Sequence, residues 1–194
     1  MSRPRRFTRA TLDWLPWLEP LAESELTERH YDGLVQRPRA KNPYFRLLSD
    51  DPDVLGARTR ADLEIFHNTG DGLPRAEREL AATTASRVNG CIYCASVHSA
   101  FTSHYSKRAD DVDRLLADGV TADLGERWNA VVEASAALTA TPPAIGPHHI
   151  ARLRAAGLDD VAIVDVINAA GFFAWANRLM LSLGEPELPE SADE

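Results

Sequence analysis

The chain has 194 residues, of which 44% are hydrophobic, and it carries a formal net charge of −8 at pH 7. This length and composition fit a single globular domain with its own core. The negative charge argues against non-specific binding of nucleic acid, whose phosphates are also negative. No apolar run is long enough to span a membrane, and the arginine-rich start lacks the apolar run of a secretory signal. The sequence therefore predicts a cytoplasmic protein that binds neither membrane nor nucleic acid.

The N-terminal half is predicted to form a short arm followed by helices. Residues 1–20 are rich in arginine, tryptophan and proline and predict an irregular arm. Two dipeptides, Asn42-Pro43 and Asp51-Pro52, combine a helix-capping side chain with a proline suited to the first helical position. The predicted helices of this half are 24–36, one that begins at Pro43, one that begins at Pro52, 74–88 with its end at Gly90, and 91–106.

The C-terminal half continues in the same pattern, because glycine or proline punctuates its apolar segments. Its predicted helices are 109–117, 124–138, 148–156 and 160–184. We find no run of alternating apolar and polar residues that would indicate a strand. The sequence therefore predicts an all-α fold. Its single domain, residues 21–184, would be a bundle of antiparallel helices, followed by an acidic, solvated tail over 185–194.

Two segments of the predicted domain resemble each other. Glu79 stands twelve residues before Cys91, and Asp160 stands equally far before Phe172, each in an alanine-rich context. Two similar helices packed about a pseudo-twofold axis would explain this likeness, and so would chance. A degenerate internal repeat is therefore one of two open interpretations.

Both cysteines of the chain lie in one short motif, which points to redox chemistry. Cys91, Cys94 and His98 are three and then four residues apart, so a helix places them on one face. A disulfide between thiols this close removes little entropy from the unfolded chain, so it would add little stability. The start of a helix favours a thiolate, because unpaired backbone N–H groups and the helix dipole stabilise negative charge there.

The motif also offers a proton relay. The imidazole of His98, one turn beyond Cys94, can accept a thiol proton because histidine titrates near neutral pH. Glu79 is the candidate to orient this imidazole, since its helix must reverse at Asn89-Gly90 and pack back along the cysteine helix. A thiolate that attacks a peroxide becomes a sulfenic acid, and the second cysteine condenses with it to a disulfide. An external dithiol then restores the two thiols by exchange.

The spacing of Glu79, Cys91-x-x-Cys94 and His98 resembles that of the alkylhydroperoxidase D (AhpD)-like family in the carboxymuconolactone decarboxylase superfamily. Residues 86–94, Ser-Arg-Val-Asn-Gly-Cys-Ile-Tyr-Cys, are similar to its peroxidase-related branch. The resemblance covers about residues 74–106, and 177–179 also look like that branch. One position departs from the best-known members: Tyr93 stands between the cysteines, where they have a histidine.

The resemblance implies an all-helical fold, homo-oligomers (dimer, trimer or hexamer) and thiol peroxidase activity without a cofactor or metal ion. It implies Glu79, Cys91, Cys94 and His98 as the catalytic residues. Cys94 would attack the peroxide, either hydrogen peroxide or an alkyl hydroperoxide, and Cys91 would resolve the sulfenic acid. The reductant would be an external dithiol or a carrier protein. The apolar helix predicted from residue 160 independently favours an oligomer, because a surface helix needs only one apolar stripe.

Several alternatives remain open at this stage. Glu79 could be an ordinary exposed residue that pairs with Arg75 or Arg78 on its own helix. The same cysteine pair could serve a non-enzymatic redox sensor or a dithiol–disulfide oxidoreductase. Zinc bound by Glu79, the two cysteines and His98 is a weaker alternative, because three ligands on one helix face crowd a tetrahedral ion. Decarboxylase-like acid/base chemistry is weaker still, because that branch of the superfamily lacks cysteines.

Overall fold

A computed structural model describes residues 3–68 and 70–189. The α-helices are α1 (Glu28–Leu34), α2 (Pro43–Leu48), α3 (Pro52–His67), α4 (Arg75–Asn89), α5 (Ile92–Ser106), α6 (Ala109–Asp118), α7 (Glu126–Thr139), α8 (Pro147–Ala155) and α9 (Asp160–Leu183). The 3₁₀ turns are η1 (Glu23–Glu25), η2 (Arg37–Lys41) and η3 (Gly119–Thr121), and the strands are β1 (Asp13–Pro16) and β2 (Gly184–Glu187). The predicted all-α fold class is confirmed.

Local capping explains where the central helices begin and end. The side chain of Asn42 accepts a hydrogen bond from the backbone N–H of Tyr44 at 2.9 Å, and proline follows it at the start of α2. Asp51 caps α3 in the same way through the N–H of Val54. Gly90 ends α4 with a φ of +78°, a left-handed conformation that glycine adopts without a steric penalty. These predicted boundaries rest on neighbouring residues alone and agree with the structure.

The predicted helix over 24–36 is divided in the structure. Glu25 accepts a hydrogen bond from the N–H of Ala22 at 2.7 Å, which closes the 3₁₀ turn η1. Thr27 then becomes the N-cap of α1, and the Nδ1 atom of His30 accepts a hydrogen bond from its backbone N–H. The helix therefore begins after Thr27 and not after Ser24.

The two ends of the described chain pair with each other, which corrects the expectation of an irregular arm and a solvated tail. Strand β1, within residues 1–20, forms an antiparallel ribbon with β2, which opens the predicted tail. Trp14 faces Pro186 in this ribbon and is 6% exposed. A Cβ atom on Gly184 would lie 2.4 Å from the Trp14 ring, so only glycine fits there. Residues 190–194 of the predicted tail lie outside the described residues.

Of the two interpretations of the likeness between residues 79–91 and 160–172, the structure favours chance over an internal repeat. Glu79 lies on α4, and Cys91 caps α5 after the turn at Gly90. The matching positions Asp160 and Phe172 lie on one continuous helix, α9. The likeness between the two segments therefore has no structural counterpart.

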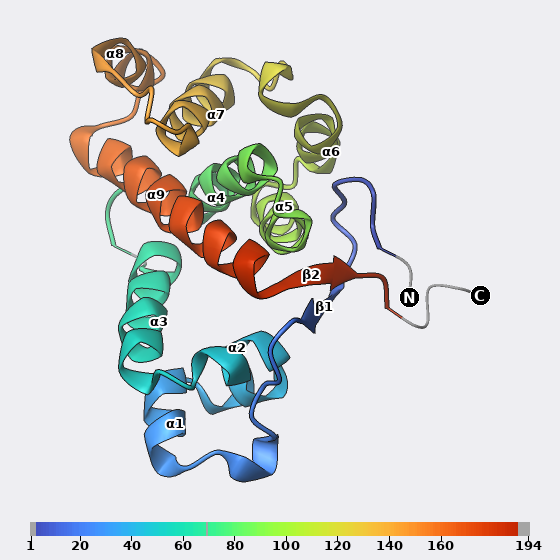
Figure 1. Cartoon of the computed structure of the whole chain (residues 1–194). Helices are drawn as coiled ribbons and strands as arrows, with labels where there is room; N and C mark the ends of the chain where they lie inside the picture. The colour runs from blue at the N-terminus through green and yellow to red at the C-terminus, as the bar shows by residue number, and fades with distance from the viewer. Residues whose placement is uncertain (1–2, 69, 190–194) are drawn as a thin grey trace.

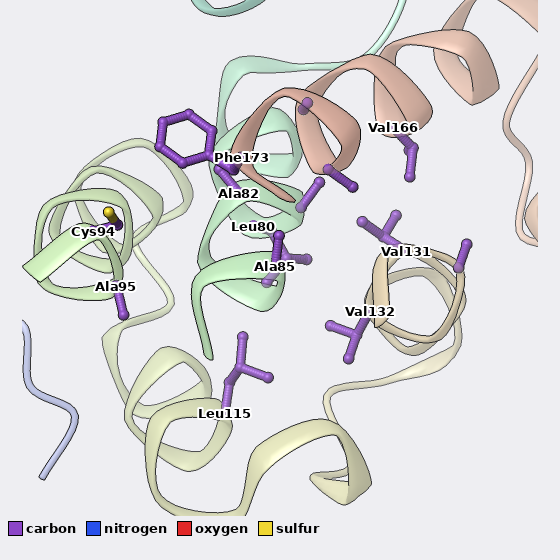
Figure 2. Packing of buried hydrophobic residues seen from close by; sticks show 14 of the residues in the cluster. Leu80, Ala82, Ala85, Cys94, Ala95, Leu115, Val131, Val132, Val166 and Phe173 are labelled. Atoms are coloured by element: carbon purple, nitrogen blue, oxygen red, sulfur yellow. The ribbon is translucent and has the colours of Figure 1, made fainter. Parts of the chain in front are cut away.

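Helix α4 occupies the centre of the molecule. It packs against α5, α7 and α9, and Figure 1 shows α9 crossing beside α4 and α5, with α1–α3 on one side and α6–α8 on the other. Small residues let these helices approach closely, as Figure 2 shows for Ala82 and Ala85 beside Leu80, all of which are fully buried. Over residues 3–68 and 70–189, no helix combines the length and the apolar character needed to cross a membrane. Helices α4 and α5 pack side by side, and these two helices carry the predicted site.

Candidate active site

The two cysteines lie at the start of α5 and are linked through the backbone. Cys91 is the N-cap, and its Sγ atom accepts a hydrogen bond from the backbone N–H of Cys94 at 3.4 Å. Both are free thiols, and they are 1% and 5% exposed, respectively. The helix start therefore supplies the N–H group that the sequence predicted would stabilise a thiolate, and it supplies that group to Cys91.

The environment shifts the pKa values of the two thiols in opposite directions. The Cys94 thiol, its backbone N–H and the Asn177 side chain lower the pKa of Cys91 and outweigh the effect of burial. Burial raises the pKa of Cys94 well above its ordinary value, and its hydrogen bond to Cys91 adds to the rise. These opposite shifts favour negative charge on Cys91 over negative charge on Cys94. Cys94 thus requires a base before it can act as a nucleophile.

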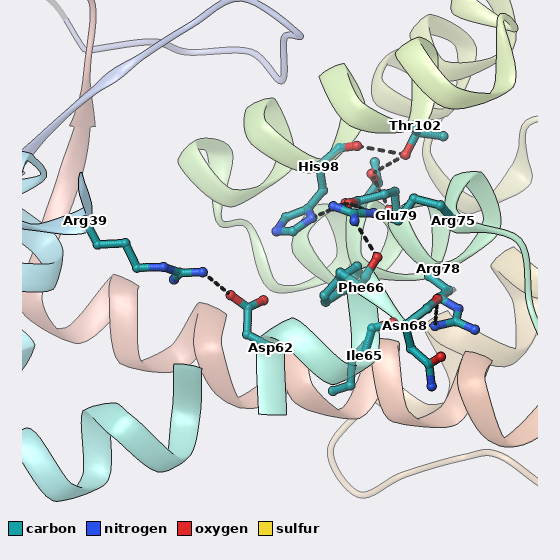
Figure 3. Close-up of polar contacts among 11 residues, drawn as sticks. Arg39, Asp62, Ile65, Phe66, Asn68, Arg75, Arg78, Glu79, His98 and Thr102 are labelled. Atoms are coloured by element: carbon teal, nitrogen blue, oxygen red, sulfur yellow. Dashed lines mark hydrogen bonds and ion pairs between the residues drawn. The ribbon is translucent and has the colours of Figure 1, made fainter. Parts of the chain in front are cut away.

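A buried carboxylate–imidazole pair lies on the same two helices. The Oε2 atom of Glu79 is 2.5 Å from the Nδ1 atom of His98, and Glu79 has no exposed surface. The other carboxylate oxygen accepts a hydrogen bond from Arg75 Nε at 2.6 Å (Figure 3). Within the described ranges, the Nε2 atom of His98 forms no hydrogen bond. Glu79 therefore favours the tautomer with the proton on Nδ1 and leaves Nε2 as the basic nitrogen.

Aromatic and hydroxyl side chains hold this pair in position. The ring of Phe173, from α9, lies edge-on to the His98 imidazole with centroids 3.9 Å apart. The hydroxyl of Thr102 donates to the carbonyl of His98, and Thr83 donates to the carbonyl of Glu79, each at 2.8 Å. The two hydroxyl oxygens lie 3.2 Å apart and join α4 to α5 at this level.

Cys94 and His98 border one cavity of about 340 Å³, and Cys91 does not line it. The Sγ atom of Cys94 lies 3.7 Å from the Sδ atom of Met180 on α9. The hydroxyl of Tyr93 faces the Nδ2 atom of Asn42 at 3.4 Å. The lining consists of Arg39, Asn42, Tyr44, Phe45, Arg58, Asp62, Phe66, His67, Arg75, Glu79, Tyr93, Cys94, Val97, His98, Phe101, Tyr105, Phe173 and Met180.

A larger and more open hollow of about 910 Å³ lies between the N-terminal arm and α6, but neither cysteine lines it.

The structure places Glu79, Cys94 and His98 around one cavity and Cys91 beside Cys94 behind its wall, and it decides between two interpretations of Glu79. Arg75 does pair with Glu79 one turn along α4, but the carboxylate is fully buried and also contacts His98, so it is not an ordinary exposed residue. Arg78 pairs instead with Asp165 at 3.0 Å. Within the described ranges, no three His, Cys, Asp or Glu side chains are placed to hold one metal ion.

Sequence reasoning missed most of the cavity wall. Tyr44, Arg58 and Met180 come from α2, α3 and α9, far from the cysteine motif along the chain. No local sequence pattern distinguishes these residues, because the same residue types occur in amphipathic helices whether they line a cavity or pack in an ordinary core. Asn177 belongs to the short segment 177–179 that resembles the family, but its own sequence context predicts no role for it. It donates to Ser86 at 3.0 Å and lowers the pKa of both thiols.

Part of the chain matches a known protein family. Residues 52–140 match the model of the carboxymuconolactone decarboxylase family. No curated protein sequence gives a significant match. This stretch of the chain is therefore similar to the carboxymuconolactone decarboxylase family, and the whole chain has a fold like that of AhpD-like proteins.

Three solved structures illustrate the likeness in fold. An uncharacterized peroxidase-related protein from Ralstonia eutropha JMP134, with an alkylhydroperoxidase AhpD core, has a TM-score of 0.74 and 21% identity over 87% of this chain and 90% of its own. A peroxidase-related protein from Silicibacter sp. TM1040 has a TM-score of 0.69 and 24% identity over 96% and 95%. The debrominase Bmp8 has a TM-score of 0.68 and 16% identity over 86% and 89%.

Proposed function

We propose that the protein is a thiol-dependent peroxidase that reduces peroxides through Cys94 and Cys91. One observation carries the proposal: Cys94 and the buried Glu79–His98 pair border the same cavity. A substrate in that cavity meets a thiol and a base together, as nucleophilic catalysis requires. A cytoplasmic location, where reduced dithiols are available, belongs to the same proposal.

In the first step, the Nε2 atom of His98 takes the proton of Cys94, whose raised pKa makes a base necessary. Glu79 stabilises the imidazolium that forms. The Cys94 thiolate attacks one peroxide oxygen, the O–O bond breaks, and the electron pair leaves on the other oxygen. His98 returns its proton to this oxygen, so the products are an alcohol or water and the sulfenic acid of Cys94.

The second step uses the different environment of Cys91. Its lowered pKa favours the thiolate, which attacks the Cys94 sulfur and displaces hydroxide. The hydroxide takes up a proton from solvent, equivalent to the one that Cys91 released, and becomes water, while a disulfide joins the two cysteines. An external dithiol reduces this disulfide by thiol–disulfide exchange and restores both thiols.

Peroxide consumption with dithiothreitol as the reductant tests the proposal. We expect turnover by the wild-type protein, a loss of roughly 10²-fold or more in the His98→Asn variant, and little change in His104→Asn. His104 is an exposed histidine on the same helix and serves as the matched control. Failure of the folded wild-type protein to consume any of a panel of peroxides would overturn the proposal.

The aromatic wall around Cys94 favours a second candidate, reductive dehalogenation of an aromatic ring. A cysteine-to-alanine variant of the debrominase Bmp8 was solved in complex with 2,3,4-tribromopyrrole. Here the two thiols would supply two electrons, the ring would exchange bromine for hydrogen, and the products would be bromide and the disulfide. Bromide release from tribromopyrrole under reducing conditions supports this candidate, and its absence alongside peroxide turnover rules it out.

A further inference from the structure

The size and walls of the cavity indicate an organic substrate. Its volume of about 340 Å³ is roughly ten times the ~30 Å³ that one water molecule occupies in the liquid, so hydrogen peroxide alone would leave most of it unfilled. Aromatic rings from four helices line it: Tyr44, Phe45, Phe66, Tyr93, Phe101, Tyr105 and Phe173. Such walls favour a flat or bulky apolar body.

The charges around the cavity are not balanced. Three arginines line it against two carboxylates, in a chain whose overall charge is negative. Arg75 pairs with Glu79. Arg39 and Arg58 must therefore share Asp62, and both bind its Oδ2 atom, at 3.2 and 2.9 Å. The lining therefore holds one more arginine than carboxylate.

Arg58 is the better placed of these two arginines to bind a ligand. It is only 9% exposed, and it lies between the rings of Phe45 and Phe172, with its guanidinium carbon 5.4 and 5.2 Å from their centroids. Its Nη1 atom binds Asp62. Among the described residues, its buried Nε atom has no hydrogen-bond partner, and the hydrogen bond of the guanidinium is the one from Nη1 to Asp62. A guanidinium held in this way offers directional donors to a carboxylate.

We propose that the cavity binds an organic hydroperoxide with an aromatic or bulky apolar body and a carboxylate group. The carboxylate binds Arg58, the body packs against the aromatic wall, and the hydroperoxide reaches Cys94 and His98. This inference rests on the proposed peroxidase function and adds the class of substrate to it. Arg58 is then a residue that determines specificity.

A matched pair of substrates tests the inference. The pair is cumene hydroperoxide with a carboxylate in the para position and the methyl ester of that acid, which differ in charge while the reacting group stays the same. We expect the wild-type protein to prefer the carboxylate by about tenfold in kcat/KM, a ratio that corresponds to one interaction of about 1.4 kcal/mol. Equal values, or a preference for the ester, would overturn the inference.

A variant pair locates the effect. Arg58→Met keeps a long side chain without its charge and should abolish the preference for the carboxylate. Arg60→Met, at an exposed position on the same helix, should retain it. Retention of the full preference by a folded Arg58→Met protein would overturn the assignment to Arg58.

Binding to the wild-type protein provides a test that depends neither on turnover nor on a variant that folds. The probes are 4-isopropylbenzoate and the neutral 4-isopropylbenzamide, and the readout is protection of Cys94 from alkylation by iodoacetamide, resolved by mass spectrometry. We expect the benzoate to protect Cys94 at concentrations about tenfold lower than the amide. Equal protection by both, or protection by neither, would overturn the inference. Binding of the benzoate without turnover of any hydroperoxide would refute the peroxidase function and leave the anion site supported.

Discussion

Two regions line the same cavity and differ in how their polar groups are satisfied. On α4 and α5, Glu79 has a partner at each carboxylate oxygen, and the group it positions, His98, is nineteen residues away along the chain. On η2 and α3, two arginines share one oxygen of Asp62, and Arg58 retains donors without acceptors among the described residues. The first region is a completed arrangement for moving a proton, and the second is an incomplete one that a ligand can complete. We therefore propose that α4 and α5 carry out the reaction, and that η2 and α3 determine which substrate binds.

The largest expected effect comes from breaking the α4–α5 arrangement. Glu79→Gln should lower kcat/KM by about 10²-fold for every peroxide alike, because the amide cannot stabilise the imidazolium of His98 as a carboxylate does. Steady-state kinetics on a panel of neutral and anionic peroxides would measure this. Glu64→Gln, at an exposed position on α3, is the control. A uniform loss confirms that α4–α5 serves the reaction, whereas unchanged kinetics in a folded Glu79→Gln protein would remove Glu79 from the site.

A smaller effect is expected at the thiols themselves. Asn177 lowers the pKa of Cys91, so Asn177→Leu should raise that pKa. The pH at which Cys91 reaches half its maximal rate of alkylation should therefore move upward. The rate of iodoacetamide labelling against pH, resolved by site, measures this shift.

Asn168→Leu, an exposed position on the same helix, should leave the alkylation profile unchanged. The Asn177→Leu protein also loses a buried hydrogen bond to Ser86, so its thermal unfolding should be recorded alongside. If the alkylation rate of Cys91 depends on pH in the same way in the folded Asn177→Leu variant, the helix start alone determines the reactivity of Cys91.

The contrast between the two regions also explains what could be predicted from sequence. The turn at Gly90 and the spacing from Glu79 to Cys91 are local, so capping rules and helix geometry predicted the α4–α5 arrangement. Tyr44, Arg58 and Met180 meet Cys94 only because α2, α3 and α9 pack around it, and no short pattern encodes such contacts. The β1–β2 ribbon was missed for the same reason, because its partners stand at opposite ends of the chain.

Association of the chain into an oligomer is expected to affect the activity of the site least. Helix α9 buries one face and exposes apolar side chains on another, namely Val161, Val164 and Trp175, which are 44–53% exposed. We propose that a second copy of the chain covers this face in a homo-oligomer. Light scattering at micromolar concentration should give a closed multiple of the 21.3 kDa chain mass. The Trp175→Glu variant should shift it toward the monomer, and a monomeric wild-type protein would contradict the proposal.

The identity of the attacking sulfur tests the central claim most directly. Of the two cysteines, Cys94 lines the cavity beside His98, whereas Cys91 is the better stabilised thiolate. The decisive measurement is sulfenic-acid trapping with dimedone after one equivalent of peroxide, read by mass spectrometry in the Cys91→Ser and Cys94→Ser variants. We predict a dimedone adduct on Cys94 in Cys91→Ser and none on Cys91 in Cys94→Ser. An adduct on Cys91 in Cys94→Ser, with Cys94 unmodified in Cys91→Ser, would contradict the account and show that thiolate stability, not access to the cavity, determines which sulfur reacts.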